Sequence, residues 1–348
     1  MENNSHLLTF VIPMYNASRT IHRCLDSIYS LPLKEDDIEV IVVDDCSTDN
    51  AVELVRDYQK EHASLTLFCQ LQNHRQGAAR NIGEEKASGD FIVFVDSDDE
   101  VDSGLIQAVN LATSKDLDMV AIRVSRVSGD GIVESEMSLP YQMDKVFAGI
   151  ELQTEHPYWG TAPWAYIYRR SFLKETNYRF AEDVLFEDSD FVNVHLYSAK
   201  RMAYSDVCGY RAHFNVNSTT HTMSYKHLAD YALLGSRMLA FYESLPNKTT
   251  KYAEGILEGG SYNVMMAFRK IWRLHSVIEI RDFYDRLETR CDLKSMLVYR
   301  KPSYCWTKWT RICLKYHRLV TLVVGLAIPV LKIKTKTKTR NCYICQQR

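Results

Sequence analysis

Short apolar runs alternate with amphipathic segments along the first 125 residues. The apolar runs predict strands at 7–13, 38–44, 65–70, 90–96 and 118–124. The segments between them have helical spacing and predict helices at 18–30, 49–61, 77–87 and 102–113. Such alternation is typical of an α/β protein in which helices flank a mostly parallel sheet. Residues 127–150 lack a strong period and predict a variable excursion, whereas residues 225–299 return to a helical pattern.

The run DFIVFVDSDD, which begins at residue 90, ends abruptly in three carboxylates, Asp96, Asp98 and Asp99. Ligands of an open parallel sheet gather beyond the carboxyl ends of its strands. Mg²⁺ and Mn²⁺ are held there by one or two carboxylates together with phosphate oxygens of the substrate. An Asp-x-Asp at a strand end is therefore a candidate nucleotide anchor, although Asp and Ser at such positions also cap helices and close turns.

Two earlier strands end in polar residues as well. In IEVIVVDDCSTDN the apolar run stops at Asp44 and Asp45. In VIPMYNA the residues Pro13, Tyr15 and Asn16 come at the end of a short apolar strand. Three predicted strands thus deliver polar side chains to one edge of the sheet.

The segments VIPMYNA, VIVVDDCSTDN, QGAARNIG and FVDSDD have an order and spacing that resembles the nucleotide-binding half of a family 2 glycosyltransferase with the GT-A fold, of the bacterial surface-polysaccharide type. The resemblance is strong to residue 125, continues loosely to residue 220 and does not cover the C-terminal third. It implies a Rossmann-like, mostly parallel sheet flanked by helices, with a helical C-terminal extension. The implied divisions are a nucleotide-sugar-binding half at 1–125, an acceptor-binding half with the catalytic base at 126–224, a helical extension at 225–299 and a tail at 300–348.

The resemblance also implies a donor site at this edge. The residues that would line its nucleoside pocket are Pro13, Tyr15, Asn16 and Asp45. Asp45 would accept a hydrogen bond from an N–H of the base, with Asp44 close by. Tyr15 has a second interpretation as an aromatic residue at the rim of the pocket.

For the Asp-x-Asp, the resemblance implies an Mn²⁺ or Mg²⁺ cofactor. Asp98 would coordinate the metal directly, Asp96 would contact the ribose, a bound water or the metal, and Asp99 would be a second ligand or a helix cap. The metal would act as a Lewis acid on the departing diphosphate. Arg80 lies near the start of the helix predicted at 77–87 and would place a cation near that diphosphate. A guanidinium at this position matches phosphate recognition better than it matches a buried face.

The acceptor side of the implied site rests on LFEDSDF, residues 185–191. Family members carry a Glu-Asp pair here, so Asp188 would deprotonate the acceptor hydroxyl and Glu187 would orient it or bind the acceptor. The local sequence alone favours an acidic helix start that complements the helix dipole. Trp159 and Trp164 lie in a segment similar to the family's acceptor region, where they would either stack on sugar or pack in the core. A single base implies direct displacement with inversion at the anomeric carbon.

The net charge of −2 conceals a strong asymmetry. Residues 300–348 contain twelve Lys and Arg and no acidic residue, so the remaining 30 basic and all 44 acidic residues give residues 1–299 a net charge of −14. The apolar stretch 319–331 is shorter than the roughly 20 residues that span a bilayer. Its basic flanks favour an interfacial helix held against anionic lipids. The alternative is an apolar helix docked on protein, followed by a disordered basic end.

Nine cysteines without a repeated spacing favour reduced thiols. The N-terminus MENNSH lacks the features of a signal peptide. We therefore expect a cytoplasmic protein, peripheral at the inner face of the cell membrane.

These inferences combine into an inverting, metal-dependent glycosyltransferase. Its expected partners are a nucleotide-diphosphate sugar, with UDP favoured, a glycan or lipid-linked glycan acceptor and an anionic membrane surface, but no nucleic acid. One alternative is a degenerate glycosyltransferase that acts as a nucleotide-sugar-binding or scaffold protein. A nucleotidyltransferase is less favoured, because MYNASRT lacks the glycine-rich basic loop expected after its first strand.

Overall fold

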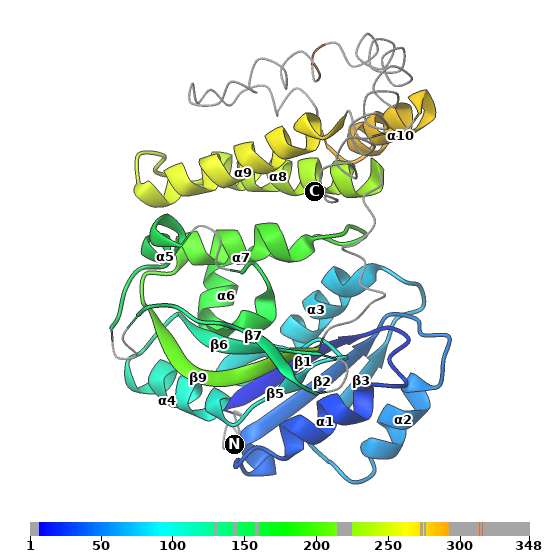
Figure 1. Cartoon of the computed structure of the whole chain (residues 1–348), viewed down its shortest axis with the longest axis vertical. Coiled ribbons are helices and arrows are strands. Elements are labelled where there is room, and N and C mark those ends of the chain that lie inside the picture. Colours follow the sequence, from blue (N-terminus) through cyan, green and yellow to red (C-terminus); the bar gives the residue numbers. More distant parts are fainter. Residues whose placement is uncertain are drawn as a thin grey trace, which may run out of the picture. The chain divides into compact units, whose positions relative to one another are not determined.

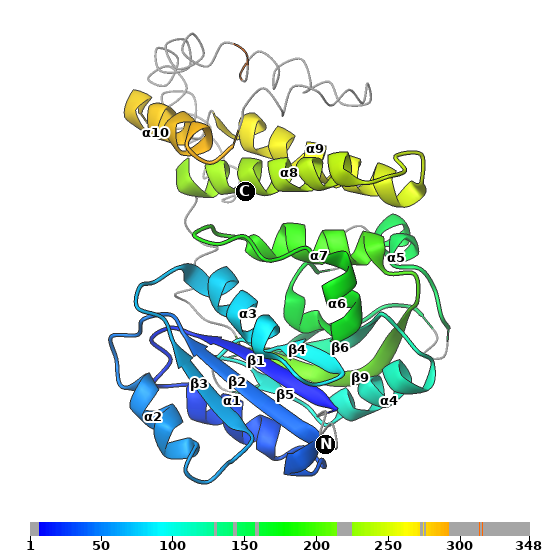
Figure 2. The same cartoon turned by 180° about the vertical axis from the view of Figure 1, so that it is seen from behind.

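The computed structural model describes residues 7–128, 131–141, 145–156, 160–213, 225–271, 274, 276–291, 313 and 315. The chain divides into two compact units, Met1–Ser218 and Thr219–Arg348. The first unit is a twisted sheet between two layers of helices (Figures 1 and 2). In the second unit, the regular elements of the described residues are helices.

Nine strands in the described part of the chain form one sheet of order β3-β2-β1-β4-β8-β6-β9-β5, with β7 paired to β6. β3, β2, β1 and β4 are parallel neighbours, β8 enters antiparallel between β4 and β6, and β6 and β9 are again parallel. The strands are β1 Leu8–Met14, β2 Ile38–Asp44, β3 Leu65–Cys69, β4 Phe91–Phe94, β5 Glu100–Val101, β6 Met119–Val127, β7 Val133–Met137, β8 Tyr166–Arg169 and β9 Met202–His213.

Helices cover both faces of this sheet. The views agree that one face carries α1 (Ile21–Tyr29), α2 (Ala51–Tyr58) and α4 (Gly104–Ser114) (Figures 1 and 2). The other face carries α3 (Arg75–Lys86), α6 (Arg170–Thr176) and α7 (Glu187–Ser198). A short helix, α5 (Gly149–Glu155), and two 3₁₀ turns, Glu35–Asp37 and Pro163–Ala165, complete the described helices of this unit.

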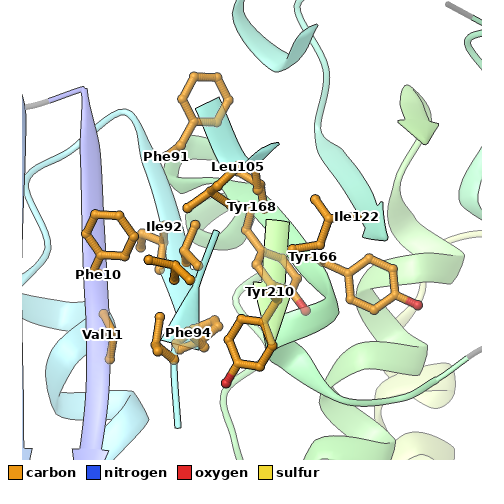
Figure 3. Close-up of a cluster of buried hydrophobic side chains, with 14 of the residues drawn as sticks. Phe10, Val11, Phe91, Ile92, Phe94, Leu105, Ile122, Tyr166, Tyr168 and Tyr210 are labelled. Atoms are coloured by element: carbon orange, nitrogen blue, oxygen red, sulfur yellow. The ribbon is translucent and has the colours of Figure 1, made fainter. Parts of the chain in front are cut away.

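The core lies along the central strands, whose apolar runs are buried on both faces. All seven residues of β1 are buried, as expected for a parallel strand with helices on either side. Figure 3 shows Phe10 of β1, Phe94 of β4 and Tyr168 of β8 in one apolar cluster. The rings of Phe94 and Tyr168 meet edge to face with centroids 5.6 Å apart, a favourable aromatic geometry.

Two local predictions differ from the structure. The predicted excursion at 127–150 contains β7, which pairs antiparallel with β6, and the start of α5. Its sequence VESEM is exposed at nearly every position, so this edge strand lacks the apolar run by which the other strands were recognised. The helix predicted to begin at Gly77 begins at Arg75, which places Gly77 within its first turn.

The second unit contains α8 (Tyr225–Ser244), α9 (Lys251–Arg269) and α10 (Val277–Glu288). The two longer helices approach closely, since a Cβ on Gly235 of α8 would lie 2.6 Å from the carbonyl oxygen of Gly260 in α9. None of the described helices combines the length and the apolar character needed to cross a bilayer. The tail from residue 300 lies outside the described residues, apart from positions 313 and 315.

Candidate active site

The loops after β1 and β2 are fastened together at the carboxyl edge of the sheet. Asn16 has a φ of 52° and its backbone N–H donates to Ser47 Oγ at 2.9 Å. Its side-chain Oδ1 accepts from the backbone N–H of Thr48 at 2.8 Å. Pro13 is buried in β1, whereas Tyr15 is 50% exposed beside this junction. Asn16 therefore ties two loops together and leaves the Tyr15 ring accessible.

The two carboxylates at the end of β2, Asp44 as its last residue and Asp45 directly after it, are both buried. Asp45 Oδ1 accepts from Gln70 Nε2 at 2.8 Å and from the backbone N–H of His74 at 2.7 Å. Burial raises the pKa of Asp45 above its usual value. Asp44 accepts from the backbone N–H of Ser47 at 3.1 Å, which closes the turn after the strand. Asp45 thus links β2 to the segment that leads into α3.

The Asp-Ser-Asp-Asp loop after β4 is anchored by the far end of β9. Tyr210 Oη accepts from the backbone N–H of Asp96 at 3.1 Å and donates to Asp99 Oδ2 at 2.7 Å. The backbone N–H of His213 donates to Asp99 Oδ1 at 2.7 Å. Burial and the nearby charges of Asp96 and Asp98 raise the pKa of Asp99 well above its usual range. Asp99 therefore holds two distant segments together, which local sequence spacing does not reveal.

Asp96 and Asp98 supply the oxygen donors that a divalent cation would need. No group of three or more His, Cys, Asp and Glu side chains in the described ranges is arranged to hold a metal. Mg²⁺ and Mn²⁺ in phosphate-transfer sites, however, are commonly bound by one or two carboxylates and the substrate's own oxygens. The negative charges of Asp96 and Asp98 both raise the pKa of Asp99, because the three neighbouring carboxylates repel one another. A divalent cation would relieve that repulsion, so the residues fit the predicted metal.

Arg80 of α3 lies at the centre of the buried charges. Only 1% of it is exposed, and its guanidinium packs over the Phe180 ring at 5.4 Å from the centroid. Nη2 donates to Asp96 Oδ1 at 2.7 Å, and Nη1 donates to Glu187 Oε1 at 2.5 Å. The sequence favoured recognition of phosphate by Arg80 over a place on a buried face; the guanidinium is buried, and its contact with a diphosphate stays a prediction. Phe180, which covers the guanidinium, belongs to the segment before α7. The sequence pattern of α3 alone does not reveal this contact.

Glu187 and Asp188 form the first turn of α7, which begins after Phe186 at a φ of 63°. Glu187 is completely buried, and burial raises its pKa while the charge of Arg80 opposes the shift. The pKa of Asp188 is raised to about 7, first by burial and then by the charge of Glu187. A carboxyl group with this pKa can exchange a proton near neutrality, as a general base must.

The segment 180–186, which precedes α7, is hydrogen-bonded to α3 and to the residue before it. His74 Nδ1 lies 3.1 Å from Asp183 Oδ1, and the backbone N–H of Asp183 donates to the His74 carbonyl at 3.2 Å. Asn81 binds both backbone polar groups of Phe180, with its Oδ1 accepting at 3.0 Å and its Nδ2 donating at 3.1 Å. Sequence reasoning missed His74 and Asp183, since neither stands in a motif that indicates its partner.

The two tryptophans expected near the acceptor have different outcomes. Trp164 is half-buried and stacks on Tyr210, with centroids 4.9 Å apart and planes 3° from parallel. One face of its ring is therefore occupied by the residue that also holds Asp99. Trp159 lies outside the described residues.

Comparisons with known proteins agree with this architecture. Residues 9–176 match the family described as Glycosyl transferase family 2. The uncharacterized glycosyltransferase EpsJ of Bacillus subtilis is 33% identical over 225 residues, which are 62% of this chain and 63% of EpsJ. The poly(ribitol-phosphate) beta-N-acetylglucosaminyltransferase TarS of Staphylococcus aureus is 27% identical over 190 residues, which are 53% of this chain and 32% of TarS. The matched region is thus less than two thirds of either curated relative.

Solved structures of S. aureus TarS share the fold. The crystal structure of TarS 1–349 matches with a TM-score of 0.65 and 19% identity over 94% of this chain and 92% of its own. The structure of the same fragment in complex with UDP-GlcNAc matches with a TM-score of 0.57 and 18% identity over 89% and 92%. The predicted fold class, a mostly parallel sheet flanked by helices with helices following it, is confirmed. Residues 9–176, just under half of the chain, therefore carry its similarity to glycosyl transferase family 2.

Proposed function

We propose that this protein is an inverting, metal-dependent glycosyltransferase that moves a sugar from a UDP-sugar to a glycan or lipid-linked glycan in polysaccharide biosynthesis. The match of residues 9–176 to glycosyl transferase family 2 supports the reaction class. The TarS complex with UDP-GlcNAc and the name of TarS as a poly(ribitol-phosphate) transferase support a UDP-linked donor and a polymeric acceptor.

The observation that carries this proposal is the buried bridge at Arg80. One guanidinium joins Asp96, at the end of the donor strand β4, to Glu187, beside the proposed base Asp188. A transferase must hold the anomeric carbon of the donor within reach of the acceptor oxygen and its base. The bridge supports such an arrangement, because Asp96 of the donor half and Glu187 of the acceptor half both bind the buried guanidinium of Arg80.

In the proposed reaction, the acceptor hydroxyl attacks the anomeric carbon while Asp188 takes up its proton and the sugar–phosphate bond breaks. The pKa of about 7 lets Asp188 be ionised at slightly alkaline pH and still hold the proton it receives. Asp45 would accept a hydrogen bond from the base of the nucleotide, with Asp44, Asn16 and Pro13 shaping the pocket. The accessible ring of Tyr15 would stack on the base.

Asp96 and Asp98 would hold Mn²⁺ or Mg²⁺, which as a Lewis acid would neutralise charge on the leaving diphosphate. Trp159 and Trp164 would border the acceptor, and Glu187, which is completely buried, would orient the base. We assign donor binding to residues 1–125 and acceptor binding with the base to 126–224. The helical extension at 225–299 and a membrane-attached tail at 300–348 complete the proposal, with the protein at the cytoplasmic face of the cell membrane.

The decisive test is calorimetric binding of UDP and GDP, with and without Mn²⁺, to the wild type and Asp98→Asn. We expect binding of UDP in preference to GDP, enhanced by Mn²⁺ and weakened at least tenfold in the variant, about 1.4 kcal/mol. Asp57→Asn is the matched control, because Asp57 is an exposed carboxylate on α2 that pairs with Lys60. A protein that binds neither nucleotide would overturn the donor site. UDP binding without any transfer would favour the degenerate, scaffold alternative.

A further inference from the structure

We propose that Arg80 is a positioning residue that couples Asp96 on the donor side to Glu187 on the acceptor side, and that it is not a ligand of the diphosphate. This inference rests on the proposed function and assigns a role within that same site. It concerns a buried cation whose two terminal nitrogens are divided between the two halves.

The contacts of Arg80 leave little of it for a substrate. Nη1 and Nη2 each donate to a carboxylate, at 2.5 and 2.7 Å, and Phe180 covers the guanidinium face. Its side chain is 2% exposed, compared with 28% for Asp96. A ligand of the diphosphate would need donors that point into the site, so Asp96 is the member of this pair that a donor can reach.

The element that carries Arg80 binds both halves at more than one point. At its start, His74 contacts Asp45 of the donor pocket through its backbone and Asp183 of the acceptor segment through its ring. A Cβ on Gly77 would lie 2.1 Å from the carbonyl oxygen of Ala181, so the helix and this segment are in direct contact. The Arg80 bridge is therefore one of several contacts between α3 and the segment before α7. We expect a displacement of Asp96 on the donor side to move Glu187 on the acceptor side.

The charges around the proposed base give this coupling a measurable consequence. Asp188 is faced by Glu187 of its own helix, Arg80 of α3, Asp96 after β4 and Tyr168 of β8. The positive charge of Arg80 favours the ionised base, whereas the negative charges of Glu187 and Asp96 oppose it. Removal of Arg80 should therefore raise the pKa of Asp188, and neutralisation of Glu187 should lower it.

The test compares Arg80→Met, Arg80→Lys and Glu187→Gln with the wild type in UDP affinity, kcat, KM and the pH profile of kcat. For Arg80→Met we expect a kcat about 100-fold lower, because the base is misplaced, and an acid limb moved up by about one pH unit. Glu187→Gln should move the acid limb down by a similar amount. Arg80→Lys keeps the charge but cannot bridge two carboxylates, so it should lose kcat with little change in the limb.

Glu187→Gln should bind UDP within about threefold of the wild type, and the Arg80 variants should lose less than tenfold in affinity, since Arg80 affects UDP only through Asp96 in this proposal. Arg123→Met is the matched control, because Arg123 pairs with Glu136 and Asp206 away from the site. An Arg80 variant that loses UDP affinity more than tenfold with an unmoved acid limb would overturn the inference and restore Arg80 as a phosphate ligand. If Arg80→Met does not fold, Arg80→Lys and Glu187→Gln decide the question by the same measurements. A wild type that neither binds UDP nor transfers sugar refutes the proposed function itself, whereas an active wild type with unshifted variants refutes only the coupling.

Discussion

The chemistry of the site depends on what burial does to individual carboxylates. Burial is the main cause of the raised pKa of Asp99 after β4 and of Glu187 and Asp188 in the first turn of α7. Asp99 is held by Tyr210 and the His213 backbone, and Glu187 is paired with Arg80. For Asp188 the pKa of about 7 lies in the range that suits a general base.

Asp188→Asn should retain UDP binding but lose transfer by a factor of roughly 10²–10⁴, the usual contribution of a general base. In the wild type, kcat should fall about tenfold per pH unit below the pKa of about 7, since the protonated carboxyl cannot accept the acceptor's proton. Rates from pH 5.5 to 9 in the wild type and variant check both statements. Asp116→Asn, at an exposed carboxylate that pairs with Arg169, should keep the wild-type profile. Unchanged turnover in Asp188→Asn would disprove the assignment of the base.

Glu84 of α3 is a half-buried residue whose carboxyl group the proposed reaction does not use, and its Oε2 atom is buried. Its Oε2 has no hydrogen-bond partner in the described part of the chain, and burial raises its pKa to about 7. The folded state therefore binds this proton more tightly than the unfolded chain, so the stability it contributes is fully present below the usual pKa of 4.5 and is lost as the pH rises through 7.

Glu84→Gln should consequently stabilise the protein at pH 8 by about 1–3 kcal/mol, the usual cost of an unsatisfied buried group. The gain should be absent near pH 4.5, where the wild-type carboxyl is also neutral. Melting temperatures at the two pH values test this prediction, with Glu53→Gln on α2 as a control whose melting temperature should change equally at both. A destabilised Glu84→Gln at pH 8 would contradict it.

At the scale of elements, α3 connects the two halves of the first unit. It packs on β1 and β2, and its buried residues Arg80 and Asn81 bind the segment 180–187. Gly77 permits this contact, because a Cβ there would lie 2.1 Å from the carbonyl oxygen of Ala181 and 3.1 Å from Glu187 Cγ. A backbone atom cannot move aside as a flexible side chain can, so the helix itself would have to shift.

Gly77→Ala should therefore destabilise the protein by about 1–3 kcal/mol, although alanine is the better helix former. It should also reduce kcat more than UDP affinity, because the displaced segment carries the base. Denaturant unfolding and steady-state kinetics measure the two effects. Lys86→Ala, at an exposed position of the same helix, should change stability by less than about 0.5 kcal/mol. A Gly77→Ala variant as stable and active as the wild type would show that this contact can relax without consequence.

The elements of the first 125 residues were predictable because their signals are local. The apolar runs of β1, β2 and β4 and the carboxylates that follow them specify both the strands and the edge at which they end. Glu187, which binds Arg80, and Tyr210, which binds Asp99, each lie more than 100 residues from their partner, and no spacing within either segment indicates these contacts. The edge strand β7 was missed for a different reason, since its exposed residues carry no period of burial.

At the scale of the whole molecule, the chain separates its charges along the sequence. Residues 1–299 carry a net charge of −14 and residues 300–348 carry twelve basic residues and no acidic one. The acidic part would be repelled by an anionic membrane, whereas the basic part would be attracted to it. Membrane attachment through the tail, which lies almost wholly outside the described residues, is therefore a proposal that the charge distribution supports.

Replacement of the five basic residues in KIKTKTKTR by Gln should abolish binding to vesicles that contain anionic lipids. Each Lys or Arg near such a surface contributes about 1 kcal/mol, so the five together would lower the affinity by about 10³-fold. Cosedimentation of the full-length wild type and this variant with anionic and purely zwitterionic vesicles measures the loss, and calorimetry should show equal UDP affinity for both proteins. Binding of the wild type should weaken as the salt concentration rises, because the attraction acts within a Debye length of about 8 Å at physiological ionic strength. Equal binding of the two proteins to anionic vesicles would place the attachment elsewhere, and no binding by either would favour the alternative in which the apolar stretch at 319–331 docks on protein.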